Sequence, residues 1–333
     1  MATQEAVVKA NLATSRFLAA SQVLQGIPRG AKSKLFVVDP ANGDPDNHGQ
    51  SLAFPLDGLE AAKDLCVSGR NDVVLYVAGA DSLNLTGATA LLWDKSYTHL
   101  VGVCAPTRVA QRARIFAPAA YAASPLITVS GSGNIFKNLY IFDGVAHAAS
   151  LIDVKVTGSR NYFQNVHFAG GGATENAING GASLNLNGAA SENLFEDCTI
   201  GLDTVAAATG MDGLLLDGGT ATVHGTRNMF KNCLFNMWAS NNGAAFVEMM
   251  TIYDIDRFLL FQKCLFLNFG TTMATAFVIP AGVDPANKRI ILEDCSMIGA
   301  TDWDKDDRGL LFSNGGTRTG GGNSGILAAT AAA

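Results

Sequence analysis

Six segments of this chain share one pattern, and their repetition constrains the fold more than any other feature. Each reads as an apolar residue, a polar residue, then Asn, Asp or Lys, a small apolar residue, a variable residue and a further apolar residue. The copies are FKNLYI from Phe136, FQNVHF from Phe163, FEDCTI from Phe195, FKNCLF from Phe230, FQKCLF from Phe261 and LEDCSM from Leu292. Their starts lie 27, 32, 35, 31 and 31 residues apart. A near-constant period of this length is typical of a solenoid.

The third position of each copy explains how one segment can bury residues that strict alternation would place on opposite faces of a strand. In FKNCLF, strict alternation would separate Phe230 from Cys233 and Phe235, whereas a bend at Asn232 lets all three face one interior. Asn and Asp tolerate the left-handed backbone that such a corner needs. The corner position holds Asn138, Asn165, Asp197, Asn232 and Asp294, with Lys263 as the exception. Two strands meeting at a one-residue corner on every turn predict a parallel β-helix.

The cysteines follow the same repeat. Cys198, Cys233, Cys264 and Cys295 occupy one position of four consecutive copies, and Leu139 and Val166 hold that position in the first two. Free Cys behaves as a small hydrophobe and is among the most buried residues. Zinc ligands usually pair at a spacing of two to four residues, whereas a whole turn separates these thiols. We predict a structural core ladder of reduced cysteines, and we also assign Cys66 and Cys104 to the core.

Composition limits the partners. Charged residues make up 16% of the 333 residues, against about 25% in an average soluble protein. The net charge of −6 argues against a nucleic-acid footprint, which would be a basic stripe. The sequence has no apolar run of membrane-spanning length, and residues 1–26 do not resemble a secretory signal. We therefore expect neither a nucleic-acid nor a membrane partner.

Residues 35–79 resemble the opening module of right-handed parallel β-helix proteins of the pectin-lyase-like class. That module has a strand, here LFVVD, a loop rich in Asp, Asn and Gly, here NGDPDNHG, and a short helix, here roughly Leu56–Val67. A Gly-Asp and the first turn follow, for which GRNDVVLYV stands. The family often continues with Pro-Gly-x-Tyr, and this chain has AGADSL instead. The resemblance implies that the helix covers the open end of the solenoid.

The segments THLVGV and Arg112 to Phe116 also resemble β-helix proteins encoded among the structural genes of tailed phages. This resemblance implies a virion component. The predicted fold class is an all-β, right-handed parallel β-helix with an N-terminal capping helix and terminal arms. The boundaries are an arm or amphipathic helix at 1–33, the opening module at 34–70, the β-helix at 71–313 and a Gly- and Ala-rich tail at 314–333.

Carboxylates are the first candidates for chemistry, because enzymes on this fold cleave polysaccharides with clustered acids. Asp254 and Asp256 are predicted to share one strand face beside Arg257, an arrangement that could serve acid–base catalysis. Asp212 and Asp217 fall at predicted turns, and His224 belongs to a His-Gly pair. Solvated turn residues are the competing interpretation. None of these segments matches a catalytic motif residue by residue, so we predict no catalytic residue.

A calcium site is the weaker candidate. Asp302, Asp304 and Asp306 have the spacing of a calcium loop, but Asp307 stands where that loop needs glycine and Ser313 where it needs glutamate. The five histidines are scattered and form no metal-ligand pair. We predict no cofactor.

The leading hypothesis is a non-enzymatic phage virion protein that decorates or cements the capsid shell. Its expected partners are the major capsid protein and other virion proteins. We expect a homotrimer, assembled in the host cytoplasm and located in the virion. The alternatives are a carbohydrate-active enzyme of the tailspike kind, or a glycan-binding adhesin on the same fold. An outward groove with three carboxylates and aromatic residues would favour the enzyme.

Overall fold

The structure is a computed structural model. It describes residues 26–79, 82–85, 91–109, 113–118, 121–283 and 288–304, and the backbone of 310–313, 317–318 and 321–322. The predicted N-terminal arm therefore lies outside the described residues as far as residue 25, as does most of the predicted tail.

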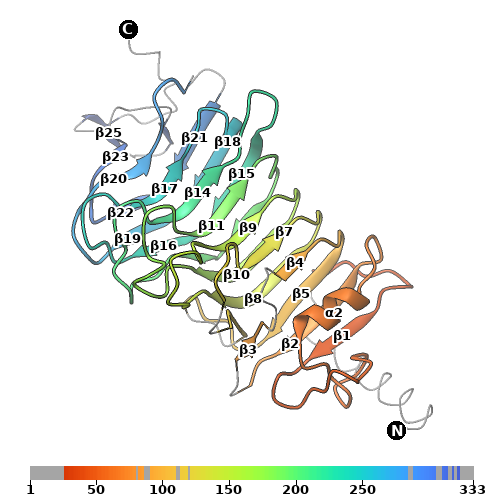
Figure 1. Cartoon of the computed structure of the whole chain (residues 1–333). Helices are drawn as coiled ribbons and strands as arrows, with labels where there is room; N and C mark the ends of the chain where they lie inside the picture. The colour runs from red at the N-terminus through yellow and green to blue at the C-terminus, as the bar shows by residue number, and fades with distance from the viewer. Residues whose placement is uncertain are drawn as a thin grey trace.

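The chain winds into an all-β parallel solenoid with three faces, shown as a rod in Figure 1. Face 1 consists of β1 Leu35–Val38, β2 Asp72–Val77, β5 Thr98–Val103, β8 Ile135–Phe142, β10 Tyr162–Ala169, β12 Leu194–Glu196, β15 Gly225–Lys231, β18 Ile255–Gln262, β21 Lys288–Glu293 and β24 Leu310–Ser313. Every pairing along this face is parallel.

Face 2 continues from face 1 after the Asn corner. It consists of β3 Leu83–Asn84, β6 Arg114–Phe116, the second halves of β8 and β10, β13 Thr199–Ile200, β16 Leu234–Met237, β19 Leu265–Asn268 and β22 Ser296–Ile298. Face 3 consists of β4 Leu91–Trp93, β7 Ile127–Val129, β9 Ile152–Val156, β11 Ala182–Asn187, β14 Asp212–Asp217, β17 Ala245–Met249, β20 Met273–Val278 and β23 Ala300–Asp304. The short strands β25 Thr317–Arg318 and β26 Gly321–Gly322 pair with each other in antiparallel fashion.

The corner predicted from the repeat is present on six turns. Its φ angles lie between 51° and 57° at Asn138, Asn165, Asp197, Asn232, Lys263 and Asp294. Lys263 adopts the same left-handed backbone as the others, although lysine has no side chain suited to it. Stacking therefore imposes the corner at this position, and Asn or Asp lowers its cost where they occur.

A second corner, between faces 3 and 1, was not predicted. Its residues Tyr97, Arg160, Glu192, Arg227 and Arg257 all have positive φ, and no residue type unites them. Three of them form an exposed ion-pair row, in which Arg160 and Arg227 contact Glu192 at 2.7 and 3.3 Å. Exposed pairs of this kind contribute about 0–1 kcal/mol each.

Two polar ladders beside the second corner hold successive turns in register. The backbone N–H groups of Thr98, Asn134, Asn161 and Asn193 each donate to the Asn side chain of the next turn, at 2.8–3.0 Å. A parallel row of hydroxyls accepts from the backbone of the next turn at Ser68, Ser96, Ser132, Ser159 and Ser191. The buried asparagines thus satisfy backbone groups that the corner removes from the β-ladders.

Phenylalanine fills the interior behind face 1. Phe136, Phe163, Phe195, Phe230 and Phe261 stack with ring centroids 4.5–5.1 Å apart and planes within 12° of parallel. This is the inward row that the repeat predicts, and Phe235 packs against it from face 2. The spacing follows the separation of neighbouring strands, about 4.8 Å.

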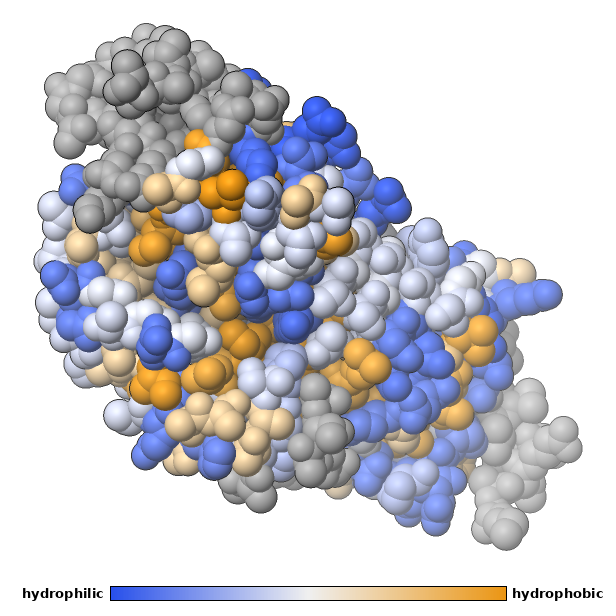
Figure 2. All heavy atoms as spheres, turned by 45° about the horizontal axis from the view of Figure 1, so that its top comes forward, coloured by the Kyte–Doolittle hydropathy of each residue, from blue (hydrophilic) through white to orange (hydrophobic). Residues whose placement is uncertain are grey.

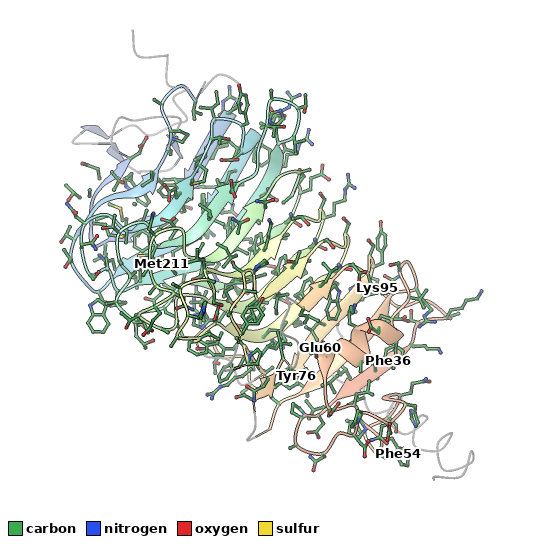
Figure 3. The ribbon with its side chains drawn as sticks, in the orientation of Figure 1. Phe36, Phe54, Glu60, Tyr76, Lys95 and Met211 are labelled. Atoms are coloured by element: carbon green, nitrogen blue, oxygen red, sulfur yellow. The ribbon has the colours of Figure 1, made fainter. Side chains whose placement is uncertain are left out.

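The helix α2, Leu59–Leu65, lies beside β1 at the N-terminal end of the rod (Figure 1). Leu59 and Ala62 are buried in the same cluster as Phe36 and Tyr76, two residues that Figure 3 labels at this end. The helix is shorter than the predicted Leu56–Val67. Leu56 instead extends along β1, donating its N–H to Val37 O at 2.9 Å, which delays the start of the helix.

Candidate functional site

The cysteine row lies in the interior. Cys198, Cys233 and Cys264 are at most 2% exposed, whereas Cys295, on the last of these turns, is half-buried. Each thiol donates at 3.4 Å to the carbonyl oxygen of a phenylalanine on the preceding turn, in order Phe163, Phe195, Phe230 and Phe261. Burial raises the pKa of the Cys233 and Cys264 thiols well above the ordinary value. Since a thiolate is the reactive species, these thiols act as packing groups.

The other two cysteines differ from each other. Cys66 is 1% exposed, and burial raises its thiol pKa to about 12. Cys104 is half-buried and packs against the main core cluster at its margin, and its Sγ lies 3.5 Å from Asn138 O. All six cysteines are free.

The Asp254, Asp256 and Arg257 cluster does not form as predicted. Asp254 precedes β18 and is 5% exposed, and its two oxygens accept from the N–H groups of Gly219 at 2.8 Å and Thr251 at 2.5 Å. Burial raises the pKa of this carboxyl. Asp256 instead contacts Arg257 at the surface, at 3.4 Å. The first carboxylate caps a turn and the second forms an exposed ion pair, so they do not share one site.

The remaining flagged residues also have separate surroundings. Asp212 starts β14 and is 1% exposed, and burial raises its pKa well above the ordinary value. Asp217, at the end of β14, accepts from Gly218 N at 2.6 Å. His224 Nδ1 lies 3.0 Å from Tyr253 O. The predicted turn position of Asp212 is wrong, because this residue belongs to a buried strand.

The proposed calcium spacing falls on a strand rather than a loop. Asp302 and Asp304 lie in β23, Ala300–Asp304, where they pair with Thr275 and Phe277 of β20. An extended strand cannot wrap its side chains around one ion as a calcium loop does. Asp306 lies outside the described residues. In the part of the chain that the structure describes, no three His, Cys, Asp or Glu residues gather as a metal site.

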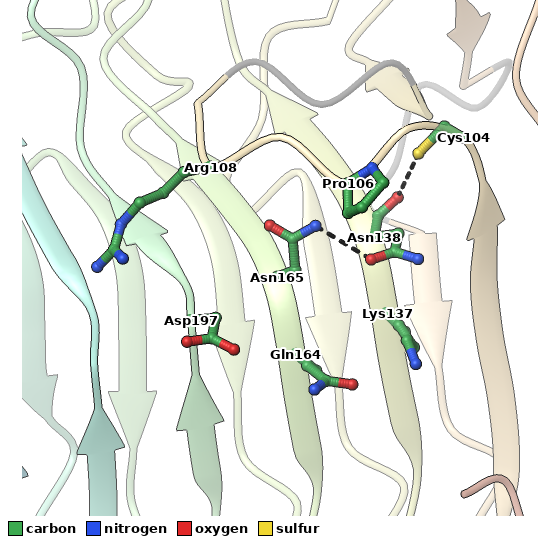
Figure 4. A pocket seen from close by; sticks show the side chains of 8 residues that line it. All are labelled: Cys104, Pro106, Arg108, Lys137, Asn138, Gln164, Asn165 and Asp197. Carbon is green, nitrogen blue, oxygen red and sulfur yellow. Dashed lines mark hydrogen bonds between the residues drawn. The ribbon is translucent and has the colours of Figure 1, made fainter. Parts of the chain in front are cut away.

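A groove that the sequence did not reveal lies at the Asn corner, beneath the loop of residues 104–109, here called the strap. The strap leaves β5 and runs across the corners of later turns (Figure 4). The cavity beneath it, here called the strap groove, has a volume of about 520 Å³. Its lining consists of Cys104, Pro106, Arg108, Lys137, Asn138, Gln164, Asn165 and Asp197.

Hydrogen bonds far along the chain hold the strap in place. The Thr199 hydroxyl donates to Arg108 O at 2.5 Å, across 91 residues of sequence. The Arg108 guanidinium donates to Asn232 O at 2.6 Å, across 124 residues. No local motif marks these partners, so only the stacking of turns brings them together. The nearest sequence signal is the polar row at the second position of each repeat, which supplies Lys137 and Gln164.

Apolar side chains are also exposed along the rod, several of them on later turns. Trp238, Phe269 and Ile298 follow or end the face 2 strands β16, β19 and β22, and are 44%, 64% and 62% exposed. Figure 2 shows hydrophobic residues interspersed with hydrophilic ones, gathered mainly on the half of the rod toward the C-terminus. The structure describes no helix long and apolar enough to cross a membrane.

Comparison with known proteins establishes the fold class. No family model matches the sequence, and no curated protein matches it. Among solved structures, the chain is similar to pectate lyase Pel9A, with a TM-score of 0.57 and 16% identity over 88% of this chain and 70% of that one. It is similar to pectin methylesterase PemA from Erwinia chrysanthemi, with a TM-score of 0.53 and 14% identity over 85% and 89%.

A rhamnogalacturonan lyase is also similar, with a TM-score of 0.52 and 17% identity over 80% of this chain and 68% of that one. At these identities the likeness concerns the fold alone. The protein therefore has the right-handed parallel β-helix fold that its opening module and repeats predict, and it shares this fold with these solved structures.

Proposed function

We propose that this protein is a non-enzymatic structural component of a tailed-phage virion, where it decorates or cements the capsid shell. Its partners are the major capsid protein and other virion proteins, and it acts as a homotrimer. The resemblance of residues 35–79 and of THLVGV to β-helix proteins of phage structural genes motivates the proposal.

The non-enzymatic part of the proposal rests on what the candidate acidic residues contact in the structure. Asp254 holds two backbone N–H groups of its own turn and a neighbouring loop, and Asp212 is buried in face 3. A general acid or base must reach the substrate proton at hydrogen-bond distance, and these two carboxyls face the protein. Asp254 therefore supports the fold, and burial keeps Asp212 away from a ligand at the surface.

The interior supports a role as a rigid component. The stacked phenylalanines and the asparagine ladder connect every turn from β8 to β18. In a solenoid each turn contacts its neighbours, so such continuous rows make the rod self-sufficient. A carbohydrate-active enzyme on the same fold is the alternative, since the similar solved structures include a pectate lyase and a pectin methylesterase.

The direct test is peptide mass spectrometry of purified virions of the phage that encodes the chain. We expect a fixed copy number relative to the major capsid protein. Absence of the protein from purified virions would contradict the proposal.

A second test addresses catalysis. We expect no cleavage when the protein is incubated with host capsular polysaccharide or lipopolysaccharide, followed by assays for reducing ends and unsaturated products. Robust turnover that Asp254→Asn abolishes would overturn the non-enzymatic proposal in favour of the enzyme. Asp94→Asn is the matched control, because this exposed carboxylate is not one of the candidate acids.

A further inference from the structure

We propose that face 1 joins two copies of this chain face to face and antiparallel, about a two-fold axis that passes between β12 and β15. The contact is a different one from that of the proposed homotrimer. On a shell it links a copy in one trimer with a copy in the next. It depends on two rows of outward side chains on face 1.

One row, here called the apolar row, runs along the rod from β8 to β21 (Figure 1). On each turn it is the residue just before the inward phenylalanine, or before Leu292 on the last turn. Successive side chains of a strand alternate between its two faces, so this residue points outward. The members are paired in register and all remain partly exposed; they are Ile135, Tyr162, Leu194, Met229, Leu260 and Ile291.

The first turns of face 1 show that outward apolar residues on this face are covered elsewhere. Val73 and Leu75 of β2 and Val101 of β5 are fully buried, and Ile27 packs with them in a cluster that has Ile135 at its margin. Among the described residues this cluster has no member on a later turn. The apolar row thus continues past its cover, and a contiguous exposed apolar patch marks an interaction site.

The second row, here called the polar row, identifies the partner. It stands two residues after the apolar row on each turn, and Figure 4 shows its first two members below the corner asparagines, on the side away from the strap. In chain order its charges are positive, neutral, negative, positive, neutral and negative. The members are Lys137, Gln164, Glu196, Lys231, Gln262 and Glu293.

This order of charges is complementary to its own reverse. A second copy turned end to end places its Glu293 opposite Lys137 and its Lys231 opposite Glu196, and the two neutral glutamines meet. Each charge therefore faces its opposite on all six turns. Such complementarity selects a partner and fixes its register, and here the partner is another copy of this chain.

The arrangement of the two rows selects the antiparallel contact over the parallel one. A two-fold axis that lies in the contact plane, perpendicular to the rods, reverses the order of the turns but leaves each row opposite itself. The apolar row then packs on the apolar row, as an isologous contact requires. An axis along the rods would instead bring Lys137 level with Lys137 of the other copy, so that the charges would not alternate.

The centre of the contact carries the strongest charge pairing. Glu196 and Lys231 already contact each other within one chain at 2.7 Å, so two such pairs meet at the axis with alternating sign. Six turns span about 24 Å at the spacing of neighbouring strands. A contact of this length and only two rows is small, so we expect reversible association.

The second corner borders the same face and carries charges of its own. The antiparallel arrangement places Glu192 opposite Arg227, which is favourable, and Arg160 opposite Arg257, which is not. Arg160 and Arg257 are exposed at the rim, where water and salt screen their repulsion. The charges of the polar row therefore decide the pairing.

Sedimentation velocity of the full chain over a range of concentrations tests the contact. We expect a species whose mass halves on dilution, from dimer to monomer or from a pair of trimers to a single trimer. Lys137→Glu should weaken this association by about tenfold or more, because it opposes like charges at Glu293 on both sides of the axis. Lys155→Glu is the matched control, since it makes the same change of charge on β9 of face 3; it should leave association unchanged.

A mixture of two variants tests the direction of the contact. Glu293→Lys alone should associate as weakly as Lys137→Glu alone. Mixed together, the two variants should regain association, because every opposed pair at the ends of the contact again has opposite charges. A parallel contact predicts no such recovery. Circular dichroism of each variant shows whether the fold persists.

Several outcomes would overturn the proposal. They are a wild-type chain that stays monomeric or forms only trimers that do not pair, an equal loss in Lys155→Glu, and a mixture that does not recover. Association that is lost on deletion of residues 1–25 but unaffected by Lys137→Glu would assign the contact to the N-terminal arm instead. None of these outcomes depends on whether the protein occurs in virions, so failure here is distinct from failure of the proposed function.

Discussion

Cys233 shows how a repeat can turn a reactive residue into a packing element. Its side chain is fully buried between the equivalent cysteines of the adjacent turns, and its thiol donates to Phe195 O. The neighbouring Cys198 and Cys264 thiols influence its pKa together with burial. Position within the solenoid, more than the chemistry of sulfur, therefore decides its role.

Cys233→Ser should lower the free energy of unfolding by about 1–3 kcal/mol, because a more polar group enters an apolar interior and is poorly placed for the same carbonyl. Urea unfolding measures the effect. In the native protein, a thiol reagent should label Cys104 and Cys295 before the three buried members of the row. Rapid labelling of Cys198, Cys233 and Cys264 would contradict the inward ladder.

His167 is a second residue whose burial has a measurable consequence. It is fully buried, its Nε2 lies 2.8 Å from Gly201 O, and burial lowers its pKa to about 4. The unfolded chain binds this proton near pH 6.5. The stability contributed by neutral His167 is thus present above pH 6.5 and is lost as the pH falls toward 4.

His167→Gln should therefore reduce the acid sensitivity of folding, by about 2–3 kcal/mol between pH 7 and pH 4.5. The measurement is urea unfolding of both proteins at the two pH values. His99, whose pKa burial also lowers to about 4, and Asp143, whose pKa burial raises to about 6, are common to both proteins. Because they cancel in the difference, equal pH dependence in the two proteins would contradict the assignment.

Among the elements, the asparagine ladder determines how turns connect. Asn193 is 1% exposed, accepts from Asn161 N, and donates to Gly158 O and Asn228 Oδ1. The Asn corner is different, because Asn232 is exposed and its main requirement is a positive φ of 52°. One asparagine row is thus needed for its side chain and the other mainly for its backbone.

We expect Asn193→Ala to cost about 2–4 kcal/mol, because it leaves a buried N–H and a buried carbonyl without partners. Asn232→Gly should change stability by less than about 1 kcal/mol, since glycine accepts the left-handed backbone freely. Denaturant unfolding of both variants compares the two rows. A larger loss in Asn232→Gly than in Asn193→Ala would reverse this assignment.

At the scale of the whole molecule, the backbone groups of the turns hydrogen-bond to one another. The terminal extensions are therefore not needed to complete the solenoid. Residues 1–33 and 314–333 carry Phe17, Leu18, Val23, Leu24, Ile326 and Leu327, all of which lie outside the described residues. Under the proposed function, these extensions contact the capsid shell. Many copies on a symmetric shell strengthen weak contacts through avidity.

Deletion of residues 1–25 should leave a folded, soluble β-helix that no longer joins capsid particles. Circular dichroism reports the fold, and co-sedimentation with capsids reports the association. Full occupancy of the shell by the truncated protein would show that the arm is dispensable.

The second corner could have been predicted from a further signal in the sequence. GNIF, RNYF, ENLF and RNMF place an asparagine two residues before each phenylalanine of four copies, and these are the buried ladder residues. The positive-φ residue before each asparagine varies among Gly, Arg and Glu, so residue preference alone could not identify that corner. The constant spacing between these asparagines and the phenylalanine row would have identified the second corner.

The sequence by itself determined the solenoid, because its period, its inward Phe and Cys positions and its Asn corner are set by residues close together in the chain. Only the tertiary structure decided where the surface groups meet. The strap reaches Thr199 and Asn232 because several turns stack between them, and Asp254 caps a loop one turn away at Gly219. Contacts across turns depend on the length of every loop between the two residues. Because the spacing of the repeats varies, a local sequence pattern does not show which residues these loop lengths bring together.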